Sequence, residues 1–350
     1  MGEGTVVAKS EDIGPNPLKV ELLCWGLETS IKDKGRRGGA GPAGGRYIEI
    51  EGDVVNVPMR SVKTSPLRLR GVGAGLEIVR SKPGGKKSWR VKLLSDPSYY
   101  SEITSSGISM KKVALLHGRD CLATTLYQSC SLKDRCRFCT IDSSFRAGDA
   151  LLWKSPHDLV EVAKGCPQAK HWTITSGYHP ILQEKLVEAL RVLKGNDKRP
   201  IHVQVSPDED LETLRDAGAD TLGIHMETLD EGVMEKVCPG KFAIGYDRFI
   251  QSLESGVEIY GDGQVSTFII LGLGEDRKKT LDGMERLVRE GIVPFLTPFR
   301  PLFTSIGLEA PDPFYMYDFY EKLADMFRQY GLDPRKSRAG CVRCGACWGL

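Results

Sequence analysis

The chain has 350 residues, 41% of them hydrophobic, and its 48 Lys and Arg balance 46 Asp and Glu to a formal net charge of +2. This near-neutral balance gives no general argument for binding nucleic acid or an anionic membrane. No apolar run reaches the ~18 residues of a membrane-spanning helix, and residues 1–17 lack the apolar core of a signal peptide. We expect a cytoplasmic protein that contacts neither nucleic acid nor membrane.

Residues 1–110 are predicted to form a small β-rich N-terminal region, because strand-like patterns such as 47–59 alternate with turn-forming segments. A Gly/Arg-rich stretch at 34–46 contains Arg36 and Arg37. It is interpreted as a solvated loop, since charged turns usually face water. The alternative is a lid whose arginines bind a carboxylate or phosphate through paired hydrogen bonds.

Residues 111–305 alternate short apolar runs with amphipathic helices. Six repeats of this pattern predict an α/β protein whose parallel strands form an open sheet or a barrel. In a barrel, functional groups collect at the C-terminal ends of the strands. Strands are expected at 121–127, 171–177, 201–207, 221–227, 264–274 and 293–301, and helices at 155–166, 181–195, 208–219, 246–256 and 277–291.

Helix boundaries are suggested by local signals. Ser-Pro pairs at 155–156 and 206–207 place a capping hydroxyl before a proline at the first helical position. Glycines stand where four helices should end: Gly195, Gly218, Gly256 and Gly291.

Two predicted strands carry polar residues on one face only. His202, Gln204 and Ser206 share one face of the third strand, and His225 and Glu227 share one face of the fourth. This asymmetry predicts an incompletely filled barrel with a polar cavity. The alternative is a fully packed barrel with incidental polar residues.

A loop after the first predicted strand contains three of the ten cysteines, Cys130, Cys136 and Cys139. Structural zinc requires four ligands, usually two close pairs, and the remaining candidate, Cys121, falls inside a predicted strand. An iron–sulfur cluster with three cysteines would leave one iron open for a substrate or cofactor, whereas electron carriers use four thiolates. We favour the cluster, with Phe138 shielding it.

A second group, Cys341, Cys344 and Cys347, lies in a C-terminal region, 306–350, expected to hold a helix and a cysteine-rich tail. Its spacing is typical of ferredoxins, although no fourth cysteine adjoins it. We predict an auxiliary iron–sulfur cluster. The alternative is zinc, with Cys238 or Cys24 as a distant ligand.

The motifs together resemble the radical S-adenosylmethionine (SAM) superfamily, and more closely a biotin-synthase-like radical SAM family encoded in bacterial nitrilase gene clusters. The resemblance spans Arg36 to Cys347 and rests on GRRGGAGP, LLHGRD followed by LATT, RCRFCTI, GIHMETLD, GLGED, PFRP and AGCVRCGAC, in that order. The gap of five residues between Cys130 and Cys136 departs from the usual three.

This resemblance implies a partial (β/α)6 TIM-like barrel and a [4Fe–4S] cluster whose open iron chelates SAM. It implies SAM contacts at the loop and strand ends: Phe138, Ile141, Thr175, Ser176, Gly177, Gln204, Ser206, Glu227, Gly272 and Gly274. Each also has an ordinary structural explanation, such as a strand-to-helix turn. Tentative substrate or radical-site residues are His225, Arg300 and Tyr178, with His202 and His179 as further candidates.

The expected function is reductive cleavage of SAM to a 5′-deoxyadenosyl radical that takes hydrogen from a small polar, amino-acid or nitrile-related substrate. A flavodoxin or ferredoxin-type reductant is implied. Two alternatives remain: biotin-synthase-like sulfur insertion using the tail cluster, and a non-catalytic iron–sulfur electron-transfer or scaffold protein.

Overall fold

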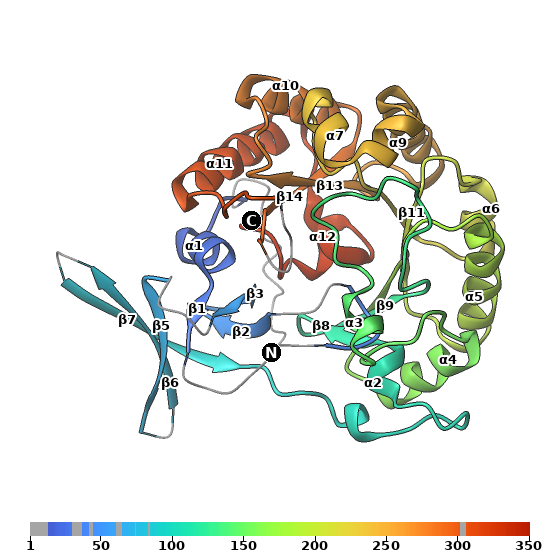
Figure 1. The fold of residues 1–350 in the computed structure, drawn as a ribbon, viewed down its shortest axis with the longest axis horizontal. Coiled ribbons are helices and arrows are strands. Elements are labelled where there is room, and N and C mark those ends of the chain that lie inside the picture. The colour runs from blue at the N-terminus through green and yellow to red at the C-terminus, as the bar shows by residue number, and fades with distance from the viewer. Residues whose placement is uncertain are drawn as a thin grey trace, which may run out of the picture.

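A computed structural model describes residues 13–29, 37–41, 45–60, 65–73, 75–82, 85–301 and 306–350. Within these ranges the strands form two seven-stranded sheets. Figure 1 shows one sheet curling around the centre of the molecule with helices outside it, and the other beside it.

The curled sheet has the order β14-β13-β12-β11-β10-β9-β8. Strands β9 to β14 run parallel, and each pairs with the strand before it in the chain. Strand β8 pairs antiparallel with β9. This mixed α/β partial barrel confirms the expected fold class. The strands are β8 (Leu115–His117), β9 (Cys121–Thr125), β10 (His171–Thr175), β11 (Ile201–Val205), β12 (Thr221–Ile224), β13 (Val265–Leu271) and β14 (Ile292–Pro298).

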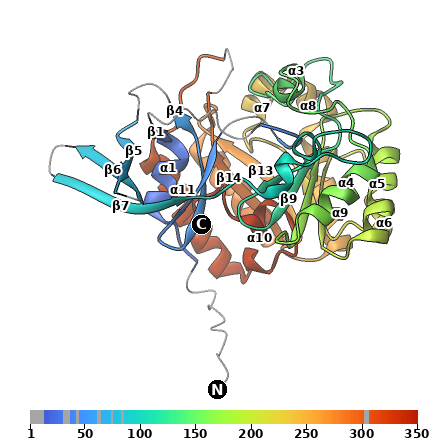
Figure 2. The ribbon, with the colours of Figure 1, turned by 90° about the horizontal axis from the view of Figure 1, so that it is seen from below.

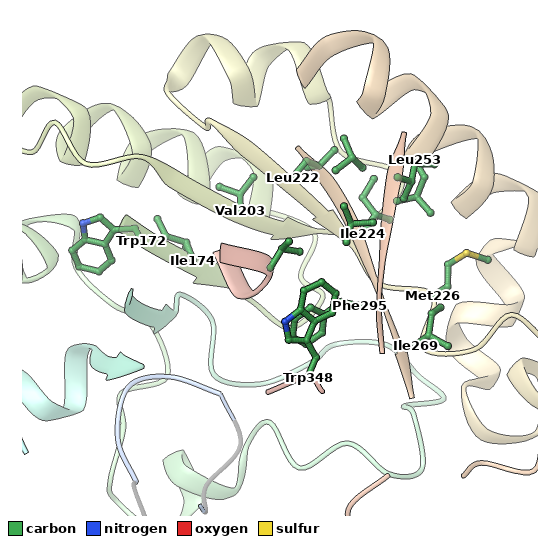
Figure 3. Close-up of a cluster of buried hydrophobic side chains, with 14 of the residues drawn as sticks. Trp172, Ile174, Val203, Leu222, Ile224, Met226, Leu253, Ile269, Phe295 and Trp348 are labelled. Atoms are coloured by element: carbon green, nitrogen blue, oxygen red, sulfur yellow. The ribbon is translucent and has the colours of Figure 1, made fainter. Parts of the chain in front are cut away.

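Helices cover the outer surface of this sheet (Figure 1). Outward-facing residues such as Val203, Leu222 and Ile224 are fully buried, and Leu253 packs among them from the helix side (Figure 3). The outer helices are α4 (Pro156–Gly165), α5 (Leu182–Asn196), α6 (Leu211–Ala217), α7 (Glu231–Val237), α9 (Tyr246–Tyr260), α10 (Arg277–Arg289) and α11 (Pro313–Tyr330). The short helix α8 (Pro239–Ile244) instead faces the inside of the half-barrel through Lys241 and Ile244. Burial of this apolar layer is the main driving force for closing the half-barrel.

Some expected helix boundaries are wrong. The Ser-Pro pair at 206–207 does not start a helix, because α6 begins at Leu211, where Asp210 accepts a hydrogen bond from the Thr213 amide. Gly195 lies inside α5. Gly256 lies inside α9, where its missing side chain allows close packing: a Cβ there would lie 2.8 Å from Leu222 Cδ2.

The other sheet has the order β3-β2-β7-β6-β5-β1-β4 and encloses its own small core, which includes Ile48, Val55 and Leu69. Figure 2 shows it flanking the barrel on the side of β14 and α11. The elements before the barrel are α1 (Pro17–Trp25), β1 (Leu27–Glu28), β2 (Arg46–Ile50), β3 (Asp53–Val57), β4 (Met59–Arg60), β5 (Leu67–Val72), β6 (Gly75–Lys82), β7 (Gly85–Leu93), the 3-10 helix η2 (Ser98–Ser101) and α2 (Met110–Val113).

The C-terminal segment returns to the inside of the barrel. After η3 (Pro334–Lys336), the short helix α12 (Gly340–Cys344) packs against β10 and β11. The Gly340 amide donates to His171 Nδ1 at 3.2 Å, and the Asn56 amide donates to the Ala346 carbonyl at 2.7 Å. This segment therefore joins the floor of the barrel to the N-terminal sheet.

Part of the Gly/Arg-rich stretch is buried, which corrects the expectation of a solvated loop for residues 38–40. The Thr125 amide donates to the Gly39 carbonyl, and the Gly41 amide donates to Thr125 Oγ1, so this segment lies beside the end of β9, beyond the part of β9 that pairs with β8. Arg36 lies outside the described residues. In the part of the chain that the structure describes, no helix is both long and apolar enough to cross a membrane.

Candidate active site

A cavity of about 480 Å³ occupies the inside of the half-barrel. Its walls bring together most of the residues that the sequence singled out, so the barrel is incompletely filled, with polar side chains set in a largely apolar wall. Expected site residues lining the cavity are Cys130, Cys136, Phe138, Cys139, Ile141, Thr175, Ser176, Gly177, Tyr178, Gln204, Ser206, His225, Glu227, Arg300, Cys341 and Cys347.

The loop of Cys130, Cys136 and Cys139 is held by backbone hydrogen bonds from three directions. The Ser131 amide donates to the Tyr178 carbonyl, and the Arg137 amide donates to the Val237 carbonyl at the end of α7, both at 2.8 Å. The Gly240 amide in α8 donates to the Asp134 carbonyl, also at 2.8 Å. The longer spacing between the first two cysteines thus provides a segment that docks on α8.

Gly177 is required by this docking. A Cβ atom at residue 177 would overlap the Ser129 carbonyl oxygen, so only glycine lets the end of β10 approach the cysteine loop this closely. Gly240 plays the same role beside the Asp134 carbonyl. The TSG segment therefore positions the loop whether or not its carbonyls also bind a ligand.

Gln128 links the loop to the barrel wall. Its Nε2 donates to the Ile141 carbonyl at 2.8 Å, and its Oε1 accepts from Lys154 Nζ at 2.8 Å. Burial lowers the pKa of Lys154 to about 7. Sequence reasoning missed both residues, because neither belongs to a motif.

A buried cysteine supports the loop from behind. Cys238 is fully buried, and its thiol is hydrogen-bonded to Cys136, which lowers the pKa of Cys136. The Cys136 sulfur is thereby favoured in the thiolate form that binds metals. The sequence allowed Cys238 as a distant zinc ligand of the tail group; the structure places it against the loop cysteines instead.

Glu227 forms an ion pair with Lys241 at the wall of the cavity. Lys241 Nζ lies 2.6 Å from Glu227 Oε1 and also donates to the His225 carbonyl at 2.6 Å. Burial opposes the charge on Lys241, but Glu227 raises its pKa above the ordinary lysine value. Glu227 has a φ of 70°, rare for a residue other than glycine and typical of strained functional positions. Lys241 carries no sequence signal that could have identified it.

The residues of the cavity fit a polar ligand and a thiolate-bound cluster. Four buried polar atoms on its wall have no hydrogen-bond partner among the described residues: Asn56 Oδ1, Ser206 Oγ, His225 Nε2 and Arg300 Nε. Buried polar atoms without partners are costly, so a bound molecule is the natural source of their missing bonds. Burial lowers the pKa of His225 well below the usual value, so its ring is neutral near pH 7.

Gly272 and Gly274 are not brought to the cavity. Both have positive φ, 99° and 95°, but a Cβ on Gly272 would meet Pro311, and its amide donates to Glu275 Oε1. The glycines therefore shape a turn closed by Glu275. Ile270, two residues earlier, reaches the cavity wall instead.

The tail cysteines lie at the opposite end of the cavity from the loop. Gln204 Nε2 lies 3.7 Å from Cys341 Sγ, and Asn56 Nδ2 lies 3.6 Å from Cys347 Sγ. Cys344 lines a separate pocket of about 430 Å³ rather than the main cavity. Cys121, a possible zinc ligand for the loop on the sequence alone, is instead hydrogen-bonded to Cys344.

A single zinc ion finds no site in this arrangement. Among the described residues, which include all ten cysteines, no three Cys, His, Asp or Glu side chains gather where one metal ion could be held. Tetrahedral zinc needs such convergence on one point. A cubane cluster places each cysteine on a different iron, so its ligands stand further apart.

Comparison with known proteins agrees with this geometry. Residues 124–288 match the model of the Radical SAM superfamily. Bacteriochlorophyllide c C-7(1)-hydroxylase of Chlorobaculum limnaeum is 24% identical over 225 residues, which are 56% of this chain and 56% of that protein. The chain thus spans about half the length of this relative.

The solved structures that resemble this chain show low identity and TM-scores below 0.5. The FeFe-hydrogenase maturase HydG from Carboxydothermus hydrogenoformans has 18% identity and a TM-score of 0.47, with 61% of this chain and 52% of that one covered. A radical SAM methyltransferase from Sphaerobacter thermophilus has 13% identity and a TM-score of 0.45, with 83% and 82% covered.

The half-barrel with a cysteine loop after its first parallel strand defines a radical SAM domain. Residues 124–288 of this chain therefore form a radical SAM domain, the type of domain with which enzymes of that superfamily use a [4Fe–4S] cluster and SAM.

Proposed function

We propose that this protein is a radical SAM enzyme that takes a hydrogen atom from a small polar substrate held inside the half-barrel. The observation that most directly supports this proposal is that the three loop cysteines and four unpartnered polar atoms line one cavity. A non-catalytic electron carrier has no need of such a cavity beside its cluster. When bound, the cluster and SAM supply a 5′-deoxyadenosyl radical on one-electron reduction.

Cys130, Cys136 and Cys139 would hold this cluster, leaving one iron open toward the cavity. Thr175, Ser176 and Gly177 end β10 beside the loop and offer backbone carbonyls to the SAM ammonium group. Glu227, fixed by Lys241, adds a carboxylate on the same side. Phe138 on the cavity wall excludes water from the loop. Ile141, positioned by Gln128, offers backbone groups to adenine.

The substrate would lie between the loop and the tail cysteines. Arg300 donates through its NH2 group to the Asn56 carbonyl, which fixes its orientation, while Nε remains available. A guanidinium in this position suits a carboxylate-bearing molecule. Gln204, Ser206 and His225 supply further hydrogen bonds, and Phe268 stacks on His225 at 4.0 Å. An amino-acid-like or nitrile-related metabolite meets these requirements.

We further propose that Cys341, Cys344 and Cys347 hold an auxiliary iron–sulfur cluster. Two of them line the substrate cavity, and Lys19, itself buried, is attracted to Cys344 and Cys347. Each region would then have its own role. The N-terminal region, 1–110, closes the side of the barrel; the middle region, 111–305, forms the radical SAM domain; and the C-terminal region, 306–350, carries the tail cluster. The reductant would be a flavodoxin or ferredoxin-type protein.

The test is anaerobic reconstitution with iron and sulfide, followed by SAM and dithionite. We expect 5′-deoxyadenosine from the wild type and none from Cys136→Ala. Cys166→Ala is the matched control, because Cys166 is also buried but contacts neither cysteine group. Failure of a fully loaded wild type to produce 5′-deoxyadenosine would refute the proposal.

A further inference from the structure

We propose that Cys121 is the fourth protein ligand of the tail cluster, so that all of its irons are bound by the chain. The inference rests on the proposed tail cluster and assigns it a ligand that lies more than two hundred residues away in sequence. It replaces the expectation of a three-cysteine cluster with an open iron.

Cys121 points into the barrel at the start of β9. It pairs in register with His171, and its sulfur lies 3.2 Å from Thr173 Oγ1, a residue of the cavity wall. Only 1% of the residue is exposed. Its thiol is hydrogen-bonded to Cys344, which belongs to a distant part of the chain. The contact therefore depends on the complete fold.

The surrounding backbone is shaped to bring these two cysteines together. Gly118, just before β9, has a φ of 57°, and a Cβ there would lie 2.8 Å from Cys344 Sγ. Gly340 has a φ of 93°, and a Cβ there would lie 2.5 Å from the His202 ring. Glycines on both sides thus allow α12 to pack on β10 and β11 while Cys344 approaches the turn that leads into β9.

The donor chemistry supports a complete set of four thiolates. The turn before β9 approaches Cys344 Sγ at Gly118, and Gln204 and Asn56 lie beside the sulfurs of Cys341 and Cys347, so α12 and the residues after it bring the three tail sulfurs to the part of the barrel where Cys121 points. The electrostatic coupling of Cys121 to Cys344 and Cys341 agrees with this placement. Four thiolates are the usual ligand set of a closed [4Fe–4S] cluster.

A closed tail cluster has a direct consequence for the substrate. Iron with four protein thiolates offers no free position, so the substrate is not ligated by the tail cluster. It is instead held by the polar atoms of the cavity, chiefly those of Arg300, Ser206 and His225.

The experiment isolates the tail cluster by replacing Cys130, Cys136 and Cys139 with Ala in the full chain. After anaerobic reconstitution this background should hold about four irons. Cys121→Ser and Cys121→Ala are then added singly, with Cys166→Ser as the matched buried-cysteine control. Iron and sulfide content, Mössbauer spectra and binding of ¹³C-labelled cyanide are measured, and far-UV circular dichroism checks the fold.

We expect the background and the Cys166→Ser control to hold the same cluster and to bind no cyanide. Cys121→Ser and Cys121→Ala should either lose the cluster or show one iron in four that is distinct and binds cyanide. Unchanged spectra in both Cys121 variants would overturn the inference while leaving the tail cluster in place. Cyanide binding by the background itself, or a Cys121–Cys344 disulfide in the anaerobic protein, would do the same. A background without iron would overturn the tail cluster as well.

Discussion

Lys241 and Glu227 form an ion pair at the wall of the cavity, with Nζ and Oε1 2.6 Å apart and both side chains less than one-fifth exposed. The pair joins the helix behind the cysteine loop to the end of β12. This ion pair links α8, on which the cysteine loop docks, to the strand ends that we expect to bind SAM. Its strength can be measured by a double-mutant cycle.

Replacing Lys241 with Met should destabilise the folded protein by about 2–4 kcal/mol, because Glu227 is left as a partly buried, unpaired carboxylate. Glu227→Gln combined with Lys241→Met should recover part of this loss, since no unpaired charge remains. Urea unfolding of the apo-proteins gives the four free energies. Strictly additive single and double effects would show that the two side chains do not interact.

Gly177→Ala should reduce the iron bound by the loop cysteines. The added Cβ overlaps the Ser129 carbonyl and must push the loop away from β10. The matched control is Gly195→Ala, because a Cβ there meets nothing within 4 Å and alanine favours a helix. Iron analysis of anaerobically reconstituted protein should show about four irons fewer for the first variant only. Full loading of Gly177→Ala would show that the loop tolerates the displacement.

Lys154 should make the unfolding free energy depend on pH. Its pKa is near 10.5 when exposed and about 7 when buried in the fold. Between these values the unfolded chain binds a proton that the folded chain does not, so stability rises with pH by up to about 1.4 kcal/mol per unit. Below about pH 7 both states are protonated and this contribution to the slope disappears.

Lys154→Met should flatten the curve between pH 7 and the onset of alkaline denaturation, as measured by urea unfolding at a series of pH values. Lys322→Met, at an exposed position of α11, is the control and should keep the wild-type slope. Equal slopes in the two variants would mean that Lys154 is protonated in the fold across this range.

Trp348 should be a major stabilising contact of the tail. It is 4% exposed and stacks on Phe295 with ring centroids 4.8 Å apart (Figure 3). Trp348→Ala should cost about 3–5 kcal/mol and alter the tail-cluster spectrum, while Phe314→Ala, at a residue 76% exposed, should change neither. A Trp348→Ala protein with wild-type stability and spectrum would contradict this account of the tail.

The parallel strands could be predicted because the residues of each strand form a recognisable pattern within a short stretch of the sequence. The alternation of polar and apolar residues around His202 and Gln204 is sufficient to identify the inner face of β11. The three-cysteine loop and its place after β9 follow from spacing and strand order. These features depend on residues close together in the chain.

The contacts that complete the site could not be predicted in this way. Cys121 meets Cys344, and Lys241 meets Glu227, only after the half-barrel closes. Gly272 and Gly274 carry the sequence pattern of a ligand-binding turn, yet neither lines the cavity, and Pro311 and Glu275 occupy the space around Gly272. The sequence predicts a helix end at Gly256, because it does not distinguish a helix-ending glycine from one that, like Gly256, allows close packing against a distant residue such as Leu222.

The return of residues 340–348 into the barrel makes the last part of the cavity wall also the last part to be synthesised. Thr221 donates to the Ala339 carbonyl and Asn56 to that of Ala346, so the segment ties early and late parts of the chain together. Contacts of such long sequence separation form late and slowly. We therefore expect the contacts of residues 340–348 to be among the last to form when the chain folds, so that the cavity closes only when this segment docks.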